Sequence, residues 1–192
     1  MAGPLSNPGA RATLAISLAM SLFGVTGVAT GMAWLRVEPR QPMQLPPEAA
    51  EATQQAMELM VDSPMLTGAA VGNVLASALL VIASFLLTAR RPSALWWAQQ
   101  ALVVSVVYTL GRLAAWGVFL YAESDTLYEI TARQIAAQVE AGEEPMSDDP
   151  GIWQMIIALS VLTVLMCAMY TLMLRRVGRD DVRTFITDGS GG

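Results

Sequence analysis

The stretch MLTGAAVGNVLASALLVIASFLLT, residues 65–88, contains no charged side chain. A helix rises about 1.5 Å per residue, so the stretch would be about 36 Å long as a helix. The hydrocarbon core of a bilayer is about 30 Å thick, and about 20 apolar residues cross it as a helix. We therefore predict that residues 65–88 form a transmembrane helix.

Three other apolar runs have a comparable length, and they occupy residues 12–35, 94–121 and 152–174. Only 14% of the 192 residues are charged, compared with about 25% in typical soluble domains. Strands of a transmembrane barrel would be about half as long and would alternate apolar with polar residues. The sequence thus predicts an all-α, polytopic membrane protein. A bundle of four transmembrane helices would form a single membrane domain over residues 1–192.

The four spans would leave outer loops at residues 36–64 and 122–151 and a charged tail at residues 175–192. The first loop is predicted to hold an amphipathic helix between Pro47 and Ser63, because polar and apolar side chains separate at helical spacing. Its polar face would be Glu48, Glu51, Gln55, Glu58 and Asp62. Its opposite face would be Ala49, Ala52, Ala56, Leu59 and Met60.

The second outer loop is predicted to hold another amphipathic helix, which the third span either continues into directly or meets at a bend near Glu123. Its apolar stripe would be Tyr128, Ala132, Ile135 and Val139, with a stop at Gly142. Both loop helices would lie on the bilayer surface, cap their own bundle or dock a partner protein. The candidate docking residues are Glu48, Glu51, Glu58 and Asp62.

Basic residues predict the orientation, because cytoplasmic loops carry more of them. Seven lie on the side of the chain termini: Arg11, Arg90, Arg91, Arg175, Arg176, Arg179 and Arg183. Three lie on the opposite side: Arg36, Arg40 and Arg133. Both termini should therefore be cytoplasmic. The use of Arg without any Lys is typical of GC-rich bacteria, which places the protein in a bacterial inner membrane.

The residue types that are missing exclude much catalytic chemistry. The chain has no His, no Lys and one cysteine, Cys167, so it lacks histidine-ligated haem or zinc, a lysine nucleophile and a dithiol pair. Neither a phosphate-binding glycine loop nor a paired nucleophile and base is present. We expect no cofactor, no metal site and no enzymatic activity. The net charge of −5 gives no support to nucleic-acid binding.

Small residues at four-residue spacing let helices approach closely in lipid. They occur in the first three spans as Gly27 and Gly31, as Gly68, Gly72 and Ala76, and as Gly111 and Ala115. Two uses fit this pattern. The residues would pack the helices of one bundle, or they would form the contact face of a homo-oligomer.

Arg112 lies within the apolar stretch of the third span, with no acidic residue within ten positions. A charge near the bilayer centre costs about 2.5–3.5 kcal/mol on insertion scales. Tyr108 precedes it by one turn, and Asn73, Ser160 and Thr26 lie at a matching depth on the other three spans. We expect Arg112 to point into the bundle toward Tyr108 and the level of Asn73. Arg112, Tyr108, Asn73 and Ser160 are therefore the candidate binding residues.

Three accounts of Arg112 fit the sequence. Its side chain would extend toward outer phosphates or loop carboxylates, meet a carboxylate or lipid headgroup at an interface with another subunit, or line a cavity for an anionic substrate or permeating ion. The inner halves of the other spans are nearly all apolar, which disfavours a pathway through the membrane. The function expected is that of a non-enzymatic accessory or scaffold subunit, which assembles with itself or with other membrane proteins among membrane lipids. The alternative is a small transporter or channel for an anionic or amphiphilic solute that uses Arg112.

Overall fold

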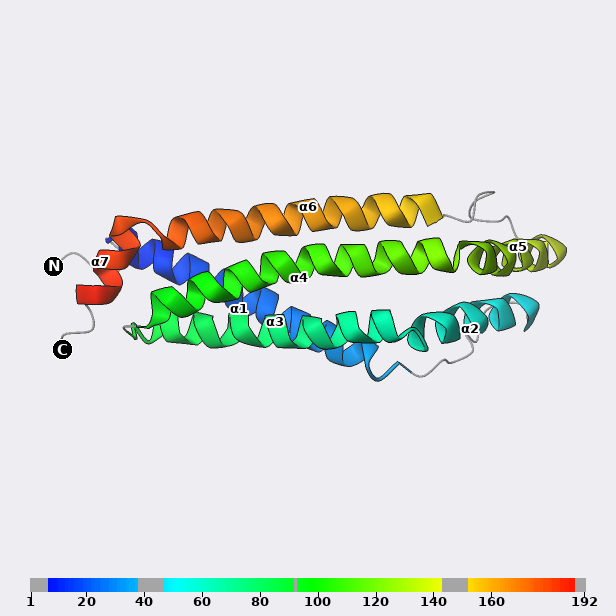
Figure 1. The fold of residues 1–192 in the computed structure, drawn as a ribbon, viewed down its shortest axis with the longest axis horizontal. Coiled ribbons are helices and arrows are strands. Elements are labelled where there is room, and N and C mark those ends of the chain that lie inside the picture. The colour runs from blue at the N-terminus through cyan, green and yellow to red at the C-terminus, as the bar shows by residue number, and fades with distance from the viewer. Residues whose placement is uncertain (1–6, 38–46, 92, 143–151, 189–192) are drawn as a thin grey trace.

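The computed structural model describes residues 7–37, 47–91, 93–142 and 152–188, and every regular element within these ranges is an α-helix. Four helices are long and apolar enough to cross a membrane. They are α1 (Pro8–Trp34), α3 (Pro64–Thr88), α4 (Ala94–Ala122) and α6 (Ile152–Val177). They run along one common long axis, with α1 crossing obliquely (Figure 1). The prediction of an all-α protein with four membrane-spanning helices is confirmed.

Local sequence signals fix the ends of several helices. Asn7 caps α1 by accepting a hydrogen bond from the Gly9 amide at 2.8 Å, with Pro8 in the first helical position. Ser63 and Pro64 begin α3 in the same way. Gly142 follows the end of helix α5 (Ser124–Glu140) with a φ of 78°, a conformation that glycine adopts without strain.

Helix α1 packs along α3, α3 along α4, and α4 along α6, whereas α1 and α6 touch at few residues. Glycines allow the close approach of α1 to α3. A Cβ atom at Gly24 would lie 2.8 Å from the Ser77 carbonyl oxygen of α3. Closer to the chain termini, the Ser17 hydroxyl donates a hydrogen bond to the Ser84 carbonyl at 2.9 Å. Close packing and interhelical hydrogen bonds are the forces that hold helices together in lipid.

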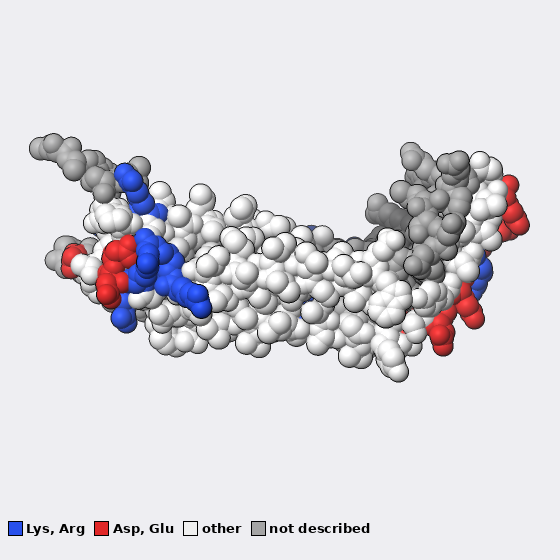
Figure 2. All heavy atoms as spheres, turned by 90° about the horizontal axis from the view of Figure 1, so that it is seen from above, with Lys and Arg blue, Asp and Glu red and all other residues white. Residues whose placement is uncertain are grey.

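The long sides of the bundle are apolar. Charged side chains gather at the two ends, and the length between them carries almost none on the face shown in Figure 2. Large side chains stand outward there, among them Phe85 at 71% exposure and Val164 at 67%. Soluble monomers rarely expose apolar patches of this extent. The surface of the bundle is thus suited to contact with lipid.

The two loop helices pair with each other beyond one end of the bundle, where α2 (Pro47–Val61) packs against α5. The faces of α2 are as predicted: Ala49, Ala50 and Ala52 are buried, and its acidic residues are exposed. On α5, the predicted stripe is exposed at Tyr128, Ala132 and Val139, so it does not pack on the bundle itself. The buried face of α5 is instead made by Leu127, Ile130 and Ala137.

A bend at Glu123 explains which face of α5 is buried. Glu123 has φ −104° and ψ 12°, outside the helical region, so α4 ends at Ala122 and α5 starts in a new direction (Figure 1). Of the two arrangements that fit the sequence, the bend is the one observed. Leu127 is thereby carried under the bundle end, where it joins a cluster with Leu66, Phe119 and Leu120.

The tail is structured, which corrects the expectation of a merely charged segment after residue 174. Helix α6 continues to Val177, and α7 (Asp180–Asp188) folds back beneath the bundle against α1. Val182 and Ile186 have no exposed surface and join the main apolar core. Asp181 is bound rather than solvated, because its Oδ2 accepts a hydrogen bond from Arg176 at 2.7 Å.

The turn between α3 and α4 also holds α7. Arg90 adopts a φ of 49°, a left-handed conformation that disfavours residues with a side chain. Its guanidinium carbon lies 3.9 Å from the centre of the Phe185 ring in α7, within the range of a cation–π contact. The contact ties the turn to the tail helix.

Candidate functional site

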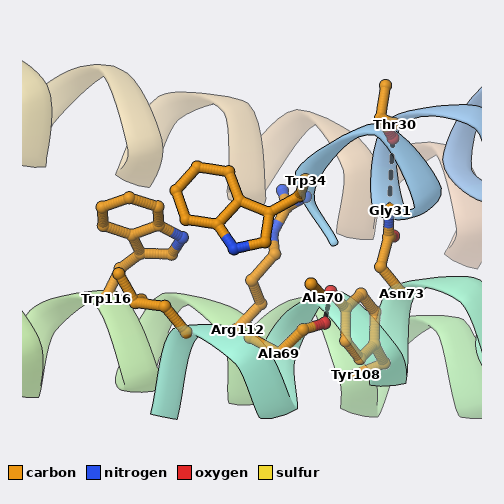
Figure 3. Close-up of a pocket in the computed structure, with 10 residues that line it drawn as sticks. Thr30, Gly31, Trp34, Ala69, Ala70, Asn73, Tyr108, Arg112 and Trp116 are labelled. Atoms are coloured by element: carbon orange, nitrogen blue, oxygen red, sulfur yellow. Dashed lines mark hydrogen bonds between the residues drawn. The ribbon is translucent and has the colours of Figure 1, made fainter. Parts of the chain in front are cut away.

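Arg112 points from α4 into the bundle, past Trp34 toward α1 (Figure 3). It lines two cavities, of about 150 Å³ and about 170 Å³. Arg112, Asn73 and Thr30 belong to the linings of both, so the two cavities adjoin at these side chains. We call the combined space the Arg112 hollow. A water molecule takes up about 30 Å³ in the liquid, so each half has room for a small polar group.

The neutral polar groups of the hollow donate hydrogen bonds to helix backbones or to one another. The Asn73 amide donates to the Gly27 carbonyl oxygen at 2.8 Å and to the Thr30 hydroxyl at 3.3 Å. The Tyr108 hydroxyl donates to the Ala69 carbonyl oxygen at 2.8 Å. These bonds tie α3 to α1 and to α4, and they hold the walls of the hollow in place. They bring no negative charge to Arg112.

No carboxylate of the described residues pairs with Arg112. The ion pairs in that part of the chain join Arg133 to Glu129 and Arg176 to Asp181, at opposite ends of the bundle. A guanidinium offers five N–H donors in a planar fork. Within the described chain, Arg112 is therefore a cation beside an internal space with no fixed counter-charge.

Aromatic side chains line the hollow toward the α2–α5 end. The Trp34 and Trp116 rings meet edge to face with centroids 6.0 Å apart, and Trp116 meets Phe119 in the same way. Toward the opposite end, the Phe23 and Tyr170 rings lie 5.9 Å apart. Below them the main apolar core fills the bundle with residues that include Met20, Leu80, Leu102 and Val177.

The structure brings together three of the four predicted binding residues. Arg112, Tyr108 and Asn73 all line the cavity that Trp34 also lines. Ser160 lines neither cavity. Helix α6 contributes Leu162, Met166 and Tyr170 instead.

Sequence reasoning placed Thr26 of α1 at the depth of Arg112 but missed Thr30 and Trp34, which line the hollow from the same helix. These residues recur every four positions and so share one side of the helix. That periodicity was the available signal. Its meaning depended on knowing that the same side of α1 faces α3, where Asn73 lies.

The small residues divide into two groups. A Cβ atom at Gly27 or Gly31 would collide with α3, one at Gly72 would lie 2.9 Å from the Tyr108 ring, and Ala76 is buried. Gly68 and Gly111, by contrast, have open space where a Cβ atom would stand, and Ala115 is half-buried. Packing inside one bundle therefore accounts for the first group and leaves Gly68 and Gly111 facing outward.

The predicted docking residues lie together on α2. Glu48, Glu51, Glu58 and Asp62 are all exposed. Glu48 and Glu51 also border a groove of about 320 Å³ whose far wall is Arg133 and Ala136 of α5. Within the described ranges, no group of three or more metal-ligating side chains comes close enough together to hold a metal ion.

The chain matches no known protein family, and no curated protein or solved structure is similar to it. Function therefore has to be argued from the geometry of this chain and its chemistry alone.

Proposed function

We propose that the protein is a non-enzymatic accessory or scaffold subunit of a bacterial inner membrane, which assembles with itself or with a larger membrane complex. The observation that carries this proposal is the layer formed by α2 and α5. The two helices bury their apolar faces on each other, and α2 thereby holds its acidic face outward in a fixed position. A preformed charged surface of this kind suits a partner with complementary basic residues.

The orientation is part of the same proposal. The surplus of Arg around α7 and the α3–α4 turn favours cytoplasmic termini, and α2 and α5 would then lie on the outer side. Thirteen of the 16 acidic residues belong to the two outer loops. The partner surface would therefore be reached from outside the cytoplasm.

Two further observations favour assembly over transport. Between the Arg112 hollow and the α7 end, the apolar core includes Met20, Leu80 and Leu102. The buried hydroxyls of Ser17, Ser84 and Ser105 in that length donate to helix carbonyls, whereas a solute pathway would require polar groups that face the solute. In addition, Gly68 and Gly111 face outward, where small residues would permit close approach of another helix.

We expect the protein, extracted from its own membrane with a mild detergent, to run as a complex heavier than the 20.5 kDa monomer. Neutralising the α2 face with Glu48→Gln, Glu51→Gln, Glu58→Gln and Asp62→Asn should lower the complexed fraction severalfold. The four carboxylates are exposed, so their removal should leave the fold intact. Native mass spectrometry of both proteins measures the fraction.

The matched control is Asp125→Asn with Glu140→Gln, which removes exposed charges from α5 instead. This variant should assemble as the wild type does. A wild-type protein that is monomeric even when extracted together with its surrounding lipid would contradict the proposal. Equal assembly of the two variants would show that the acidic face of α2 has no part in it.

A further inference from the structure

The Arg112 hollow poses a question that assembly through α2 leaves unanswered. A charged side chain inside a membrane is expensive and is normally paired with an opposite charge or placed beside water. Here the described chain supplies no carboxylate, and the surrounding neutral groups are bonded to backbone carbonyls. The guanidinium interacts with the Tyr108 side chain and lines a hollow that has room for a small charged group.

The hollow reaches the side of the bundle between α1 and α6. Its wall there is formed by Thr26 of α1 and Leu162 of α6; Thr26 is exposed and Leu162 is 47% exposed. These two helices touch at few residues, whereas the other neighbouring spans pack along each other. The hollow is thus open at the lipid-facing surface between α1 and α6.

We propose that the Arg112 hollow binds the phosphate or carboxylate group of an anionic membrane amphiphile. The anionic group enters between α1 and α6 and pairs with the Arg112 guanidinium, whose planar fork matches an oxyanion. The apolar chain stays outside, along the Thr26–Leu162 opening, in contact with lipid and with the apolar surface of α6.

The arrangement of the walls favours this ligand over a carboxylate on a partner's transmembrane helix. All four spans contribute to the lining, so the half-buried Arg112 side chain is set back between the helices. A helix is about 10 Å wide with its side chains, so a partner helix would stay outside the opening between α1 and α6 and could reach Arg112 only with a long side chain. A single headgroup needs only the existing cavity volume of about 170 Å³.

The aromatic cover has a consistent role. Trp34 and Trp116 belong to the hollow's lining and to the apolar cluster at the α2–α5 end. Their rings place apolar surface beside Arg112, and less polar surroundings strengthen the attraction between a cation and an anion. The apolar chain of an amphiphile would keep its anionic group at this depth in the membrane.

The test uses the full chain in dodecyl maltoside micelles, titrated with dodecyl phosphate, a single-chain amphiphile with the same alkyl chain. We expect a saturable rise in the unfolding temperature. Arg112→Gln should raise the half-saturation concentration by about tenfold to a hundredfold, because a hydrogen bond to a charged group is lost. The half-saturation concentration of Arg112→Lys should lie between those of the wild type and Arg112→Gln, since lysine keeps the charge but lacks the planar fork of arginine.

Three controls separate binding at this site from general effects. Arg36→Gln removes an exposed Arg just beyond the end of α1 and should titrate as the wild type does. Thr26→Trp places a large side chain at the opening and should weaken binding while Arg112 is still present. Arg112→Gln leaves no acidic partner behind, so without ligand its unfolding temperature should match or exceed that of the wild type.

The outcomes decide the proposal. Equal half-saturation for wild type and Arg112→Gln, or a response that never saturates, would overturn it. If inorganic phosphate alone raised the unfolding temperature equally at the same concentration, the proposal of an amphiphile would be refuted. The ligand would then be an anion from the aqueous phase. Unweakened binding to Thr26→Trp would refute access between α1 and α6.

Discussion

Gly24→Leu is expected to prevent the native packing of α1 on α3. A Cβ atom at Gly24 would already lie 2.6 Å from Val81 Cγ2 and 2.8 Å from the Ser77 carbonyl oxygen. The second contact is with backbone, so the helices must separate to relieve it. Gly24→Ala should cost about 1–3 kcal/mol through overpacking. Gly24→Leu should abolish the monodisperse peak in detergent size-exclusion chromatography.

Gly68→Leu is the matched control for this substitution. It makes the same change in a second span, where no heavy atom lies within 4 Å of the added Cβ position. Both variants gain helix propensity equally, because Leu is preferred to Gly in helices. The Gly68→Leu monomer should unfold at the same temperature as the wild-type monomer. A normal peak and unfolding temperature for Gly24→Leu would refute the packing of α1 described above.

Ile186→Ala is expected to release α7 from the end of the bundle. Ile186 is completely buried in the same core as Val182 and Val177. Truncation of a buried Ile costs about 2–5 kcal/mol, from lost burial and from the cavity that remains. Trypsin cleaves after Arg, and Arg183 lies within α7. Cleavage there should accelerate about tenfold or more, because the open form becomes more populated.

Thr184→Ala provides the comparison for Ile186→Ala, since Thr184 is exposed in the same helix. Its effect on unfolding should stay within about 0.5 kcal/mol, as for other surface substitutions. Equal cleavage rates for the two variants would show that α7 is not docked. Helix propensity cannot explain a difference in cleavage rate, because both substitutions introduce Ala, which is a better helix former than Ile or Thr.

The sequence was sufficient for the four spans because length and apolar composition alone determine whether a helix can cross lipid. It was insufficient for the packing faces. Gly68 and Gly72 belong to the same spacing pattern, yet only Gly72 contacts another helix, the Tyr108 ring. The spacing records which residues are small and not the direction in which a neighbour lies. Gly24, the most closely packed glycine of α1 against α3 backbone, was outside the predicted set.

The faces of the short helices depended on tertiary structure. On α5, the stripe of Tyr128 and Val139 and the stripe of Leu127 and Ile130 both have helical spacing. The bend at Glu123 selects the second. For α7, the tail is rich in charge, and its two buried residues, Val182 and Ile186, are too few to stand out without the surface that they meet.

Depth along the helices was predictable at the candidate site, whereas rotation about the helix axes was not. Counting residues inward from the span ends placed Asn73 and Ser160 at the level of Arg112. Asn73 faces the hollow, but Ser160 lies on a part of α6 that does not line it. Helix α6 contacts the bundle mainly through α4, so few constraints visible in the sequence specify which of its sides faces inward.

The central claim is that four spans place α2 and α5 together on the side of the membrane opposite both termini. The most direct measurement is labelling of single cysteines in a Cys167→Ser background, with a membrane-impermeant maleimide applied to spheroplasts. Gln55→Cys on α2 and Glu140→Cys on α5 are both at exposed positions and should react from outside. Ser93→Cys, exposed in the α3–α4 turn, should react only after permeabilisation. Labelling of Ser93→Cys from outside, or protection of either outer position, would contradict the arrangement.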